Sequence, residues 1–424
     1  MRFLLVNPWI ADFAAYNFWV RPLGLYALAE WLYSLGADIH LLDCLSPFPA
    51  PGRFKRVQVS LPIQEKMPIK RSFARYGIDL NEFRRRLRCA MPFDAVFITS
   101  VMSYWYPGIS WAVEEIRRVV DNVPIILGGI YATLWREHAM EHMDVDLVCS
   151  GPLQENTEKI AAFLGLGSQL RQWKPWYQLP LWDGVAYGAI RTAVGCPFRC
   201  SYCASRIVSG AFKQRNIEQV LKEIVFLYNK GVRQIAFYDD ALLVDFDLRL
   251  GPILERLESN RIHLEFHTPN GLHARFLNKD VALRLVRSNF KTIRLSLETV
   301  NSARQKSTGG KVTSQDLERA IDCLLSAGMH RDCIGVYLLV GLPGQDLDEV
   351  EESILYVQSL GVRPYLAEFS PIPGTLDWQI LEREGFVSKN MDPMLTNNTV
   401  FYRLYKDYDM ERFRRLKRLA ASSI

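Results

Sequence analysis

The hydrophobic and polar positions of the first 165 residues follow two alternating spacings. Short apolar runs bounded by turn residues predict buried strands, and longer stretches with apolar residues every three or four positions predict helices. The predicted strands are residues 3–6, 38–42, 95–100, 125–127 and 146–149, and the predicted helices are residues 23–35, 109–120 and 155–164. Because strands that alternate with helices favour parallel pairing, we expect an α/β fold with a doubly wound, Rossmann-like sheet over residues 1–165.

The same alternation resumes at residue 185 and continues to about residue 385. The predicted strands are residues 185–194, 234–238, 263–268, 292–297, 334–340 and 365–369, and the predicted helices are residues 217–229, 248–257, 279–286, 314–326 and 347–360. Six such repeats are two short of a closed eightfold barrel, so we expect a (βα)6 partial TIM barrel. Between the two series, residues 166–184 are predicted to be a linker, and residues 386–424 a C-terminal helical tail.

Two basic segments stand outside this alternation. Residues 45–91 are rich in Pro, Lys and Arg, end in a basic helical stretch at residues 84–88, and are too long for an ordinary loop. We interpret them as an insertion in the first domain that binds a partner, covers a ligand site or presents a solvated helix face. The basic helix predicted at residues 411–421 could likewise contact an acidic or nucleic-acid partner or lie on the surface.

Composition narrows the class of protein. A chain of 424 residues, 49% hydrophobic and 23% charged, is typical of a soluble protein with two or three domains. The formal net charge of +5 permits an anionic partner without requiring one, and we expect neither a nucleic-acid nor a membrane partner. The N-terminus predicts a strand rather than a signal peptide, and the eight cysteines include three in one tight cluster, so we expect a cytoplasmic protein.

The cysteine cluster is the strongest chemical signal. Cys196, Cys200 and Cys203 have the spacing C-x3-C-x2-C directly after a predicted strand. Thiolates select iron–sulfur clusters, zinc or copper, and three clustered ligands suggest a metal centre with one open position. The other predicted strands also end in polar or glycine residues on the same face, which is where barrel enzymes keep their active sites.

These motifs resemble the radical S-adenosylmethionine superfamily. The resemblance is carried by Gly-Cys-Pro-Phe-x-Cys-x-Tyr-Cys at residues 195–203, by Gly-Leu-Pro-Gly at residues 341–344 and by Ser-Pro-x-Pro-Gly-Thr at residues 370–375. The first domain is similar to the cobalamin-binding domain that precedes the barrel in the cobalamin-dependent class, through residues 21–25, 128–132 and 150–151. Together the resemblance covers residues 1 to about 385.

The resemblance implies a set of cofactors and contacts. The three cysteines would hold a 4Fe–4S cluster whose fourth iron binds S-adenosylmethionine, and an electron would release a 5′-deoxyadenosyl radical that abstracts hydrogen from an unreactive carbon. An electron donor such as flavodoxin or ferredoxin is then expected. The implied S-adenosylmethionine contacts are Phe198, Tyr202, Asp239, Asp240, Ser296, Glu298, Gly341 and Ile372. The implied cobalamin contacts are Pro22, Leu23, Ser100, Gly128, Gly129, Ser150 and Gly151.

Several of these positions have a structural alternative. The sequence lacks the glycine-rich acidic motif that is common where Asp239 and Asp240 stand, so this pair could simply cap the following segment. Glu298 could be the ion-pair partner of Arg294 or Arg304. The first domain also lacks Asp-x-His-x-x-Gly, so no histidine from residues 8–22 would bind cobalt, and the aromatic residues there and at 104–106 could cover the corrin or pack between domains.

Three hypotheses for function follow. The first is a cobalamin-dependent radical enzyme that transfers a methyl group to an unactivated carbon or phosphorus. The second uses the same radical chemistry for a rearrangement, ring contraction or cyclisation, or has no bound cobalamin. The third, which the alignment of six strand ends argues against, is a non-catalytic zinc or cluster protein. The sequence identifies neither the substrate, which could be a small molecule or a peptide, nor a catalytic acid or base.

Overall fold

The computed structural model describes residues 1–46, 52–67, 69, 71–167, 172–181, 187–405 and 409–422. The chain forms two compact units. The first unit comprises Met1–Val185 with Ser388–Val400, and the second comprises Ala186–Val387 with Phe401–Ile424. The segment predicted to be a C-terminal tail is therefore divided between the units. None of the helices in the described residues has both the length and the hydropathy needed to span a membrane.

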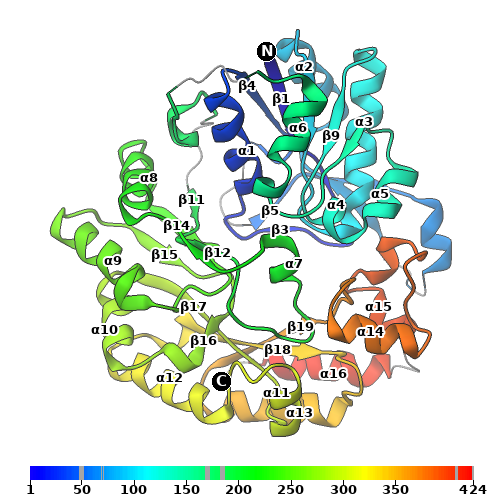
Figure 1. Cartoon of the computed structure of the whole chain (residues 1–424). Helices are drawn as coiled ribbons and strands as arrows, with labels where there is room; N and C mark the ends of the chain where they lie inside the picture. Colours follow the sequence, from blue (N-terminus) through cyan, green and yellow to red (C-terminus); the bar gives the residue numbers. More distant parts are fainter. Residues whose placement is uncertain are drawn as a thin grey trace. The chain divides into compact units, whose positions relative to one another are not determined.

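The first unit is built on a parallel sheet (Figure 1). Its described strands, in spatial order, are β10 (Leu147–Val148), β9 (Ile125–Leu127), β8 (Ala95–Ile98), β1 (Arg2–Asn7) and β4 (Asp38–Asp43). Its helices are α1 (Leu23–Ser34), α2 (Leu80–Ala90), α3 (Tyr106–Val119), α4 (Ile130–Leu134), α5 (Arg136–His142) and α6 (Thr157–Leu164). The chain passes from β1 to β4 on one side and then to β8 on the other, so the topological switch point lies between β1 and β8. In such sheets ligands bind beyond the carboxyl ends of the strands at the switch point.

The predicted insertion, residues 45–91, consists of a segment of short strands and the helix α2. Strand β7 (Phe73–Tyr76) pairs with β2 (Ile10–Asp12) and β6 (Arg56–Val59) in a small antiparallel sheet, and β3 (Tyr16–Asn17) pairs with β5 (Gly52–Arg53). A short 3-10 helix, η1 (Pro62–Lys66), lies between β6 and β7. Residues 47–51, 68 and 70 of the predicted insertion lie outside the described residues. Helix α2, by contrast, packs on β4 and α3, so it is the ordinary crossover between β4 and β8 rather than inserted structure.

The basic stretch of α2 has a structural explanation. Phe83 and Leu87 are fully buried, and the arginines on the other faces meet carboxylates of the same unit. Arg84 donates two hydrogen bonds to the buried Glu115, at 2.5 and 2.9 Å. Arg85 and Arg86 both bind Glu82 in the first turn of the helix. Of the interpretations left open, these contacts favour the solvated helix face.

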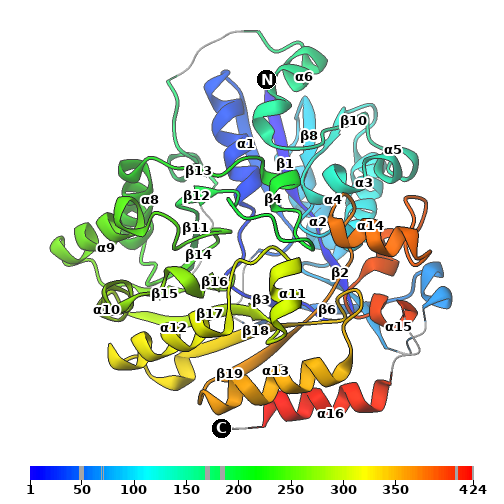
Figure 2. The same ribbon diagram turned by 60° about the horizontal axis from the view of Figure 1, so that its bottom comes forward.

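The second unit is built on a parallel sheet of seven described strands, six of which lie side by side in chain order. The strands are β11 (Tyr187–Ile190), β14 (Gln234–Phe237), β15 (Glu265–His267), β17 (Phe290–Glu298), β18 (Ile334–Val340) and β19 (Arg363–Glu368). The helices between them are α8 (Ile217–Asn229), α9 (Leu250–Ser259), α10 (Lys279–Arg287), α12 (Ser314–Ser326) and α13 (Leu347–Ser359), and they line the outside of the curved sheet (Figure 2). Both parts of the predicted fold class are confirmed.

Shorter elements complete the second unit. Strand β12 (Ala193–Val194) pairs with β13 (Lys213–Gln214), and β16 (Leu272–His273) pairs with β17. The short helices are α7 (Ser205–Ser209), α11 (Ser302–Ser307), α14 (Leu376–Arg383) and α15 (Phe401–Tyr405). The single strand predicted at residues 185–194 is thus divided in two, and its first two residues lie outside the described ones. The chain leaves the sheet after Ile190 and enters β12 at Ala193.

The last helix, α16 (Met410–Ala421), packs along α13 and β19 through Phe413 and Leu416 (Figures 1 and 2). Its basic face meets carboxylates on those elements. Arg412 pairs with Asp348 and Glu351 of α13, and Lys417 pairs with Glu368 of β19. The basic C-terminal helix is therefore a surface helix of the barrel, and these three contacts absorb two of its charges.

The loop after β9 provides a test of the first unit's packing. Gly129 has a φ of +91°, and a Cβ there would lie 2.5 Å from the carbonyl oxygen and 2.7 Å from the amide nitrogen of Ser100. We expect Gly129→Ala to destabilise the unit by about 3 kcal/mol, since backbone strain and overpacking each cost about 1–3 kcal/mol. Urea denaturation followed by circular dichroism measures this loss.

The neighbouring glycine is the control. A Cβ on Gly128 would meet no atom within 4 Å, so Gly128→Ala should unfold at nearly the wild-type urea concentration. Equal denaturation midpoints for the two variants would contradict the close approach of Gly129 to Ser100.

Candidate functional site

The cysteine loop, residues 195–204, leaves β12 through Gly195, whose φ is +77°. Cys196 is buried, Cys200 is half-buried and Cys203 is exposed, and none of them forms a disulfide. In the described part of the chain, no three His, Cys, Asp or Glu side chains converge on one point as ligands of a single metal ion would. Each cysteine of a 4Fe–4S cluster binds a different iron, so three free thiols spread along one loop fit such a cluster.

Two neighbouring segments hold the cysteine loop at Ser201. The Ser201 amide donates to the carbonyl of Thr308 at 3.2 Å, and the Ser201 carbonyl accepts from the amide of Asp377 at 3.1 Å. Thr308 follows α11 and Asp377 lies in the first turn of α14. At Gly309, whose φ is +114°, a Cβ would lie 3.0 Å from the Arg199 carbonyl oxygen. The residue between Cys200 and Tyr202 is therefore fixed from both sides.

Aromatic packing supports the other end of the loop. Cys196 lies in a small apolar cluster with Ala241 and Val244. Phe198 stacks on the imidazole of His273, with 4.7 Å between ring centroids. Burial, with smaller effects from nearby cations, lowers the pKa of His273 to about 3, so its ring is neutral at physiological pH. Phe198 therefore packs against protein and supports the loop that carries the cysteines.

The carboxylate of Asp239 makes its contacts with other residues of the protein interior. Its carboxylate is fully buried and accepts hydrogen bonds from the Thr192 amide and hydroxyl and from the Ala193 amide, at 2.6–3.0 Å. Arg249 forms an ion pair with it at 2.8 Å. The contacts to Thr192 and Ala193 turn the chain out of the sheet between β11 and β12, which explains the division of the predicted strand. This geometry favours a structural role for Asp239 over contact with S-adenosylmethionine.

Arg249 was not singled out from the sequence. Its side chain is 1% exposed, and besides Asp239 it binds the carbonyl oxygens of Ala241, Leu242 and Val244 at 2.8–3.0 Å. Because Ala241 and Val244 pack against Cys196, the ion pair shapes both the start of the cysteine loop and the surface beneath it. Arg249 directly precedes α9, and an arginine at the start of a helix carries no sequence signal for such burial.

Asp240, the next residue, faces the site. It is half-buried, and one oxygen accepts from the Ser205 hydroxyl at 2.7 Å. Burial is the main cause that raises the pKa of the Cys196 and Cys203 thiols, and the charge of Asp240 adds a smaller effect. Its carboxylate therefore lies near two of the three cysteines. Of the two predicted carboxylates, Asp240 is the one that is partly exposed and that lies beside Ser205, whose amide donates to the Cys203 sulfur.

Glu298 ends β17 in an unusual backbone conformation. Its φ is +73°, which is costly for a residue with a side chain, and the pairing of β17 with β18 shifts between Ser296 and Glu298. The Glu298 carboxylate is buried and pairs with Lys311 at 2.5 Å. The alternative partners considered from the sequence, Arg294 and Arg304, are therefore wrong. Strain of this kind concentrates at functional sites.

Lys311 is the cation of this site. Its ammonium lies 5.5 Å from the ring centroid of Tyr202. Burial alone would lower the pKa of Lys311, but Glu298 and the thiols of Cys200 and Cys203 outweigh burial and raise it. Burial raises the pKa of the Cys200 thiol, and the charge of Lys311 offsets part of this rise. A lysine directly after the Gly309–Gly310 pair was the available signal, and sequence reasoning missed it.

Three further predicted contacts lie at strand ends of the barrel. The hydroxyl of the buried Ser296 points at Gly271, where a Cβ would lie only 2.1 Å from it. Gly341 has a φ of +92° and its amide donates to the Gln345 side chain at 2.8 Å. Ile372 is half-buried in the turn before α14, where its carbonyl accepts from Thr375.

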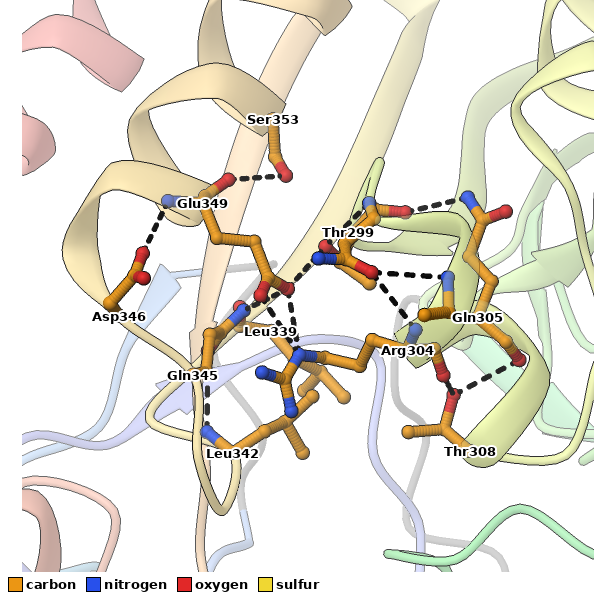
Figure 3. Close-up of polar contacts among 12 residues, drawn as sticks. Thr299, Arg304, Gln305, Thr308, Leu339, Leu342, Gln345, Asp346, Glu349 and Ser353 are labelled. Atoms are coloured by element: carbon orange, nitrogen blue, oxygen red, sulfur yellow. Dashed lines mark hydrogen bonds and ion pairs between the residues drawn. The ribbon is translucent and has the colours of Figure 1, made fainter.

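A polar network holds the loop after β18 (Figure 3). The buried Glu349 of α13 accepts from Arg304 at 2.8 and 3.0 Å and from the Thr299 hydroxyl at 2.6 Å. Gln345 accepts from the amides of Gly341 and Leu342. Since Arg304 lies on α11, which ends at the segment that binds Ser201, this network joins the Gly341 loop to the segment beside the cysteines.

The predicted cobalamin contacts lie at the carboxyl edge of the first unit's sheet. The Ser100 hydroxyl donates to the Gly128 carbonyl at 3.1 Å and accepts from the Tyr131 amide at 2.8 Å. The Ser150 hydroxyl donates to the Ala132 carbonyl, and the Gly151 amide donates to Thr133. These contacts brace the segments that follow β8, β9 and β10 against one another. Gly129 is explained by its contact with Ser100, whereas Gly128 leaves open space that a ligand can fill.

The other two predicted cobalamin contacts lie at the start of α1, and two of the aromatic residues noted in the sequence pack within the first unit. Pro22 is buried before α1, and Leu23 begins that helix. Trp9 is 1% exposed and donates from Nε1 to the Ile78 carbonyl at 2.7 Å, and Trp105 donates to Asp12 at 2.7 Å. These two tryptophans therefore pack inside the first unit, an arrangement that neither sequence interpretation included.

Removing the buried cation tests the role of the Asp239–Arg249 pair. We expect Arg249→Met to cost about 3–5 kcal/mol of unfolding free energy, because it leaves a carboxylate buried without its counter-charge. Arg256→Met is the control, since Arg256 pairs with Glu218 at the surface and such pairs contribute about 1 kcal/mol or less. Chemical denaturation measures both losses, and equal losses would contradict the assignment.

The pKa of His273 predicts a pH effect. Neutral His273 stabilises the folded state above its ordinary pKa of 6.5, and this contribution is lost as the pH falls from 6.5 towards 3. We expect wild-type protein to lose more stability than His273→Phe between pH 7.5 and pH 5. Urea midpoints at the two pH values measure the difference, and parallel losses would show that His273 is not responsible.

Sequence relatives support the chemistry of the second unit. Residues 190–357 match the family model of the radical SAM superfamily. An uncharacterized methyltransferase of Pyrococcus horikoshii is 24% identical over 324 residues, which cover 68% of this chain and 69% of the relative. The ribosomal protein uS12 methylthiotransferase RimO of Chlorobium phaeobacteroides is 26% identical over 189 residues, covering 42% of this chain and 44% of RimO, so this chain spans less than half of that relative.

Two solved structures share the fold of nearly the whole chain. The radical S-adenosylmethionine methyltransferase TsrM from Kitasatospora setae, solved with cobalamin and a 4Fe–4S cluster, has a TM-score of 0.67 at 16% identity, covering 91% of this chain and 75% of TsrM. The cobalamin-dependent radical enzyme OxsB, solved with aqua-cobalamin and S-adenosylmethionine, has a TM-score of 0.58 at 14% identity, covering 99% of this chain and 60% of OxsB. With its three cysteines at the head of a six-stranded partial barrel, the segment 190–357 of this chain is a radical SAM domain.

Proposed function

We propose that this protein is a cobalamin-dependent radical S-adenosylmethionine enzyme that transfers a methyl group to an unactivated carbon or phosphorus of its substrate. The observation that carries the proposal is a cysteine loop beside a buried lysine and two acidic strand ends, in a chain that also has a parallel sheet with a ligand-binding switch point. The shared fold with TsrM, which is named as a methyltransferase, supports the reaction type.

The cysteine loop supplies the cluster ligands. Cys196, Cys200 and Cys203 would hold three irons of a 4Fe–4S cluster, which would supply the electron that cleaves S-adenosylmethionine. The protein fixes the loop through Ser201 and through the Asp239–Arg249 pair. Because assembly requires thiolates and burial raises the pKa of these thiols, metal binding releases protons.

The polar strand ends supply the contacts to S-adenosylmethionine. Asp240 is assigned to the amino group, because its charge lies near two cysteines and one of its oxygens already binds Ser205. Glu298 and Ser296 are assigned to the ribose hydroxyls, Gly341 and Ile372 to the adenine, and Tyr202 to the adenine side of the loop. Lys311 offsets the negative charge of the cysteinates and of Glu298.

The carboxyl edge of the first sheet is assigned to cobalamin. Gly128 and Gly24, near the starts of two connections at this edge, leave space into which a side chain would project without contact. Pro22, Leu23, Ser100, Ser150 and Gly151 complete the proposed site, with Gly129 bracing its floor. The loop between β1 and α1 contains no histidine, so cobalt would take no imidazole ligand from it.

The second candidate function uses the same radical chemistry for a reaction other than methyl transfer. OxsB is named as a cobalamin-dependent radical enzyme without reference to methyl transfer, and it shares the fold of 99% of this chain. A rearrangement, ring contraction or cyclisation therefore remains the alternative. Product analysis separates the two, since methyl transfer adds one methyl group to the substrate and the alternative reactions do not.

Anaerobic reconstitution tests the cluster. We expect about four irons per chain and a broad cluster absorbance in the wild type, and neither in Cys200→Ala. Cys89→Ala, which removes an exposed thiol of α2, is the matched control and should load normally. If protein purified under anaerobic conditions contains only zinc, the radical mechanism is refuted.

Corrinoid retention on gel filtration tests the first unit. After incubation with hydroxocobalamin, the wild type should elute with a protein-bound corrinoid spectrum, and Gly128→Leu should lose it while keeping about four irons. Loss of retention in the wild type would leave the radical chemistry standing and remove cobalamin from the proposal. Cleavage of S-adenosylmethionine with and without methylcobalamin, followed by mass analysis of host metabolites, then identifies the substrate.

A further inference from the structure

The inner face of the second unit's sheet is the face turned away from the outer helices (Figure 2), and it carries polar side chains. On β18, Val336 and Leu338 are 0% exposed where α13 packs on the strand, whereas Tyr337 between them is half-buried. On β17, Arg294 is likewise half-buried between fully buried neighbours. Because successive side chains of a strand point to opposite faces, Arg294 and Tyr337 point away from the helices. A closed barrel fills this space with branched apolar side chains, so polar residues here point to a ligand.

The strand register brings two arginines together across this face. Arg294 of β17 lies beside Gly335 of β18, and Gly335 lies beside Arg363 of β19. Since neighbouring strands lie about 4.8 Å apart, the Cα atoms of the two arginines lie about 10 Å apart. Both guanidinium groups also approach the ring of Tyr365, at 4.5 Å from its centroid for Arg294 and 5.3 Å for Arg363.

Gly335 lets these side chains pack over the strand. A Cβ at this position would lie 2.5 Å from Cε2 of Tyr365 and 3.2 Å from Cδ of Arg294. Gly335 lies inside β18, so no turn requires a glycine there. Glycine within a strand marks a place where other groups approach the backbone closely. The missing side chain therefore belongs to the arrangement of the arginines and the tyrosine.

The positive charge of the two arginines is not neutralised by the protein. Across the described ranges, neither Arg294 nor Arg363 forms an ion pair with a carboxylate. The Arg294 guanidinium donates to two backbone carbonyl oxygens at 3.1 and 3.4 Å and to the Tyr365 hydroxyl at 3.4 Å, all of them neutral acceptors. A half-buried guanidinium with such long contacts retains donors for a stronger, anionic partner.

The carboxylates at this end of the sheet have other contacts. Glu265 of β15 accepts from the Gln234 amide at 3.4 Å. Asp332, before β18, is exposed and lies 3.2 Å from His330. Lys291 of β17 is exposed and adds a further cation. The anion that would balance Arg294 is therefore expected from a ligand.

We propose that Arg294 and Arg363 bind an oxyanion of the substrate, a carboxylate or a phosphate, on the inner face of the barrel sheet. The inference rests on the proposed function and names the chemical class of its substrate. A guanidinium binds two oxygens of a carboxylate or phosphate through parallel N–H groups, which fixes orientation as well as affinity. An oxyanion between the two arginines would replace the long contacts of Arg294 with short, charge-assisted ones.

The strand geometry also places this anion relative to the proposed cofactor contacts. Ser296, assigned to the ribose of S-adenosylmethionine, follows Arg294 by two residues on β17, which is about 7 Å along the strand. Tyr337 lies beside Ser296 in the register, and its hydroxyl donates to the Pro269 carbonyl at 3.0 Å. The body of the substrate would therefore lie against Tyr337, with its charged group about 7 Å or more from the ribose.

Binding of matched probes to the full chain tests the site. The probes are phenylacetate and phenyl phosphate, which carry the two oxyanions, and phenylacetamide, a neutral molecule with nearly the shape of phenylacetate. Ligand-observed NMR titration gives the dissociation constant of each. The test variants are Arg294→Gln and Arg363→Gln, and the control is Arg414→Gln, which removes an exposed arginine of α16. Because Arg363 is exposed, its variant should fold even if Arg294→Gln does not.

The expected result is specific to the anionic probes. The wild type should bind at least one of them about tenfold more tightly than phenylacetamide, and each test variant should lose about tenfold in affinity for that anion. Binding of phenylacetamide should be the same in every chain, and Arg414→Gln should match the wild type with all three probes. The anion that binds more tightly identifies the oxyanion as carboxylate or phosphate.

Three outcomes would overturn the proposal. The first is a wild type that binds neither anion more tightly than phenylacetamide. The second is wild-type anion affinity in the test variants, and the third is an equal loss in Arg414→Gln, which would show that only net charge matters. Failure of the proposed function is distinguishable, because it appears as a wild-type chain that assembles no cluster, whereas these titrations require neither cluster nor S-adenosylmethionine.

Discussion

The buried ion pair between Asp239 and Arg249 determines how the chain reaches its reactive cysteines. Asp239 draws the backbone of Thr192 and Ala193 out of the sheet, and Arg249 gathers the carbonyl groups of the loop that packs beneath Cys196. Burying two charges is costly unless geometry and hydrogen bonding compensate, and here nearly every polar group of the pair has a partner. The exit angle of the cysteine loop, and with it the position of the three thiols, depends on this compensation.

A second charge system lies where ligands would bind. Lys311 faces Glu298 on one side and the thiols of Cys200 and Cys203 on the other, so its ammonium balances groups that would otherwise repel one another. Glu298 holds a strained backbone conformation at the end of β17. A buried cation, a carboxylate on a strained backbone and three free thiols thus lie on the segments that follow the barrel strands. The structural pair at Asp239 lies at the end of β14 and the Glu298–Lys311 pair at the end of β17, with β15 between the two strands.

In the first unit, glycines and short polar side chains fix the loops at the carboxyl edge of the sheet. Ser100, Ser150 and Thr133 tie the loops after β8, β9 and β10 together, and Gly129 permits the close approach to Ser100. Such bracing keeps the carboxyl edge of a parallel sheet rigid without filling it, which is what a preformed ligand site requires. Gly128 remains free of contacts on the side where a ligand would lie.

The sequence by itself determined the fold class, because apolar spacing reports which element type can bury its residues, and helices such as α8 and α12 and strand β18 have the predicted bounds. It also determined the cysteine motif, since those three thiols are local in the chain. Only the tertiary structure decided the rest. It separated Asp239 from Asp240, paired Glu298 with Lys311 rather than an arginine, made α2 a crossover helix and buried Arg249. The physical reason is that the partner of a buried charge is set by packing between segments distant in sequence, and no local pattern encodes it.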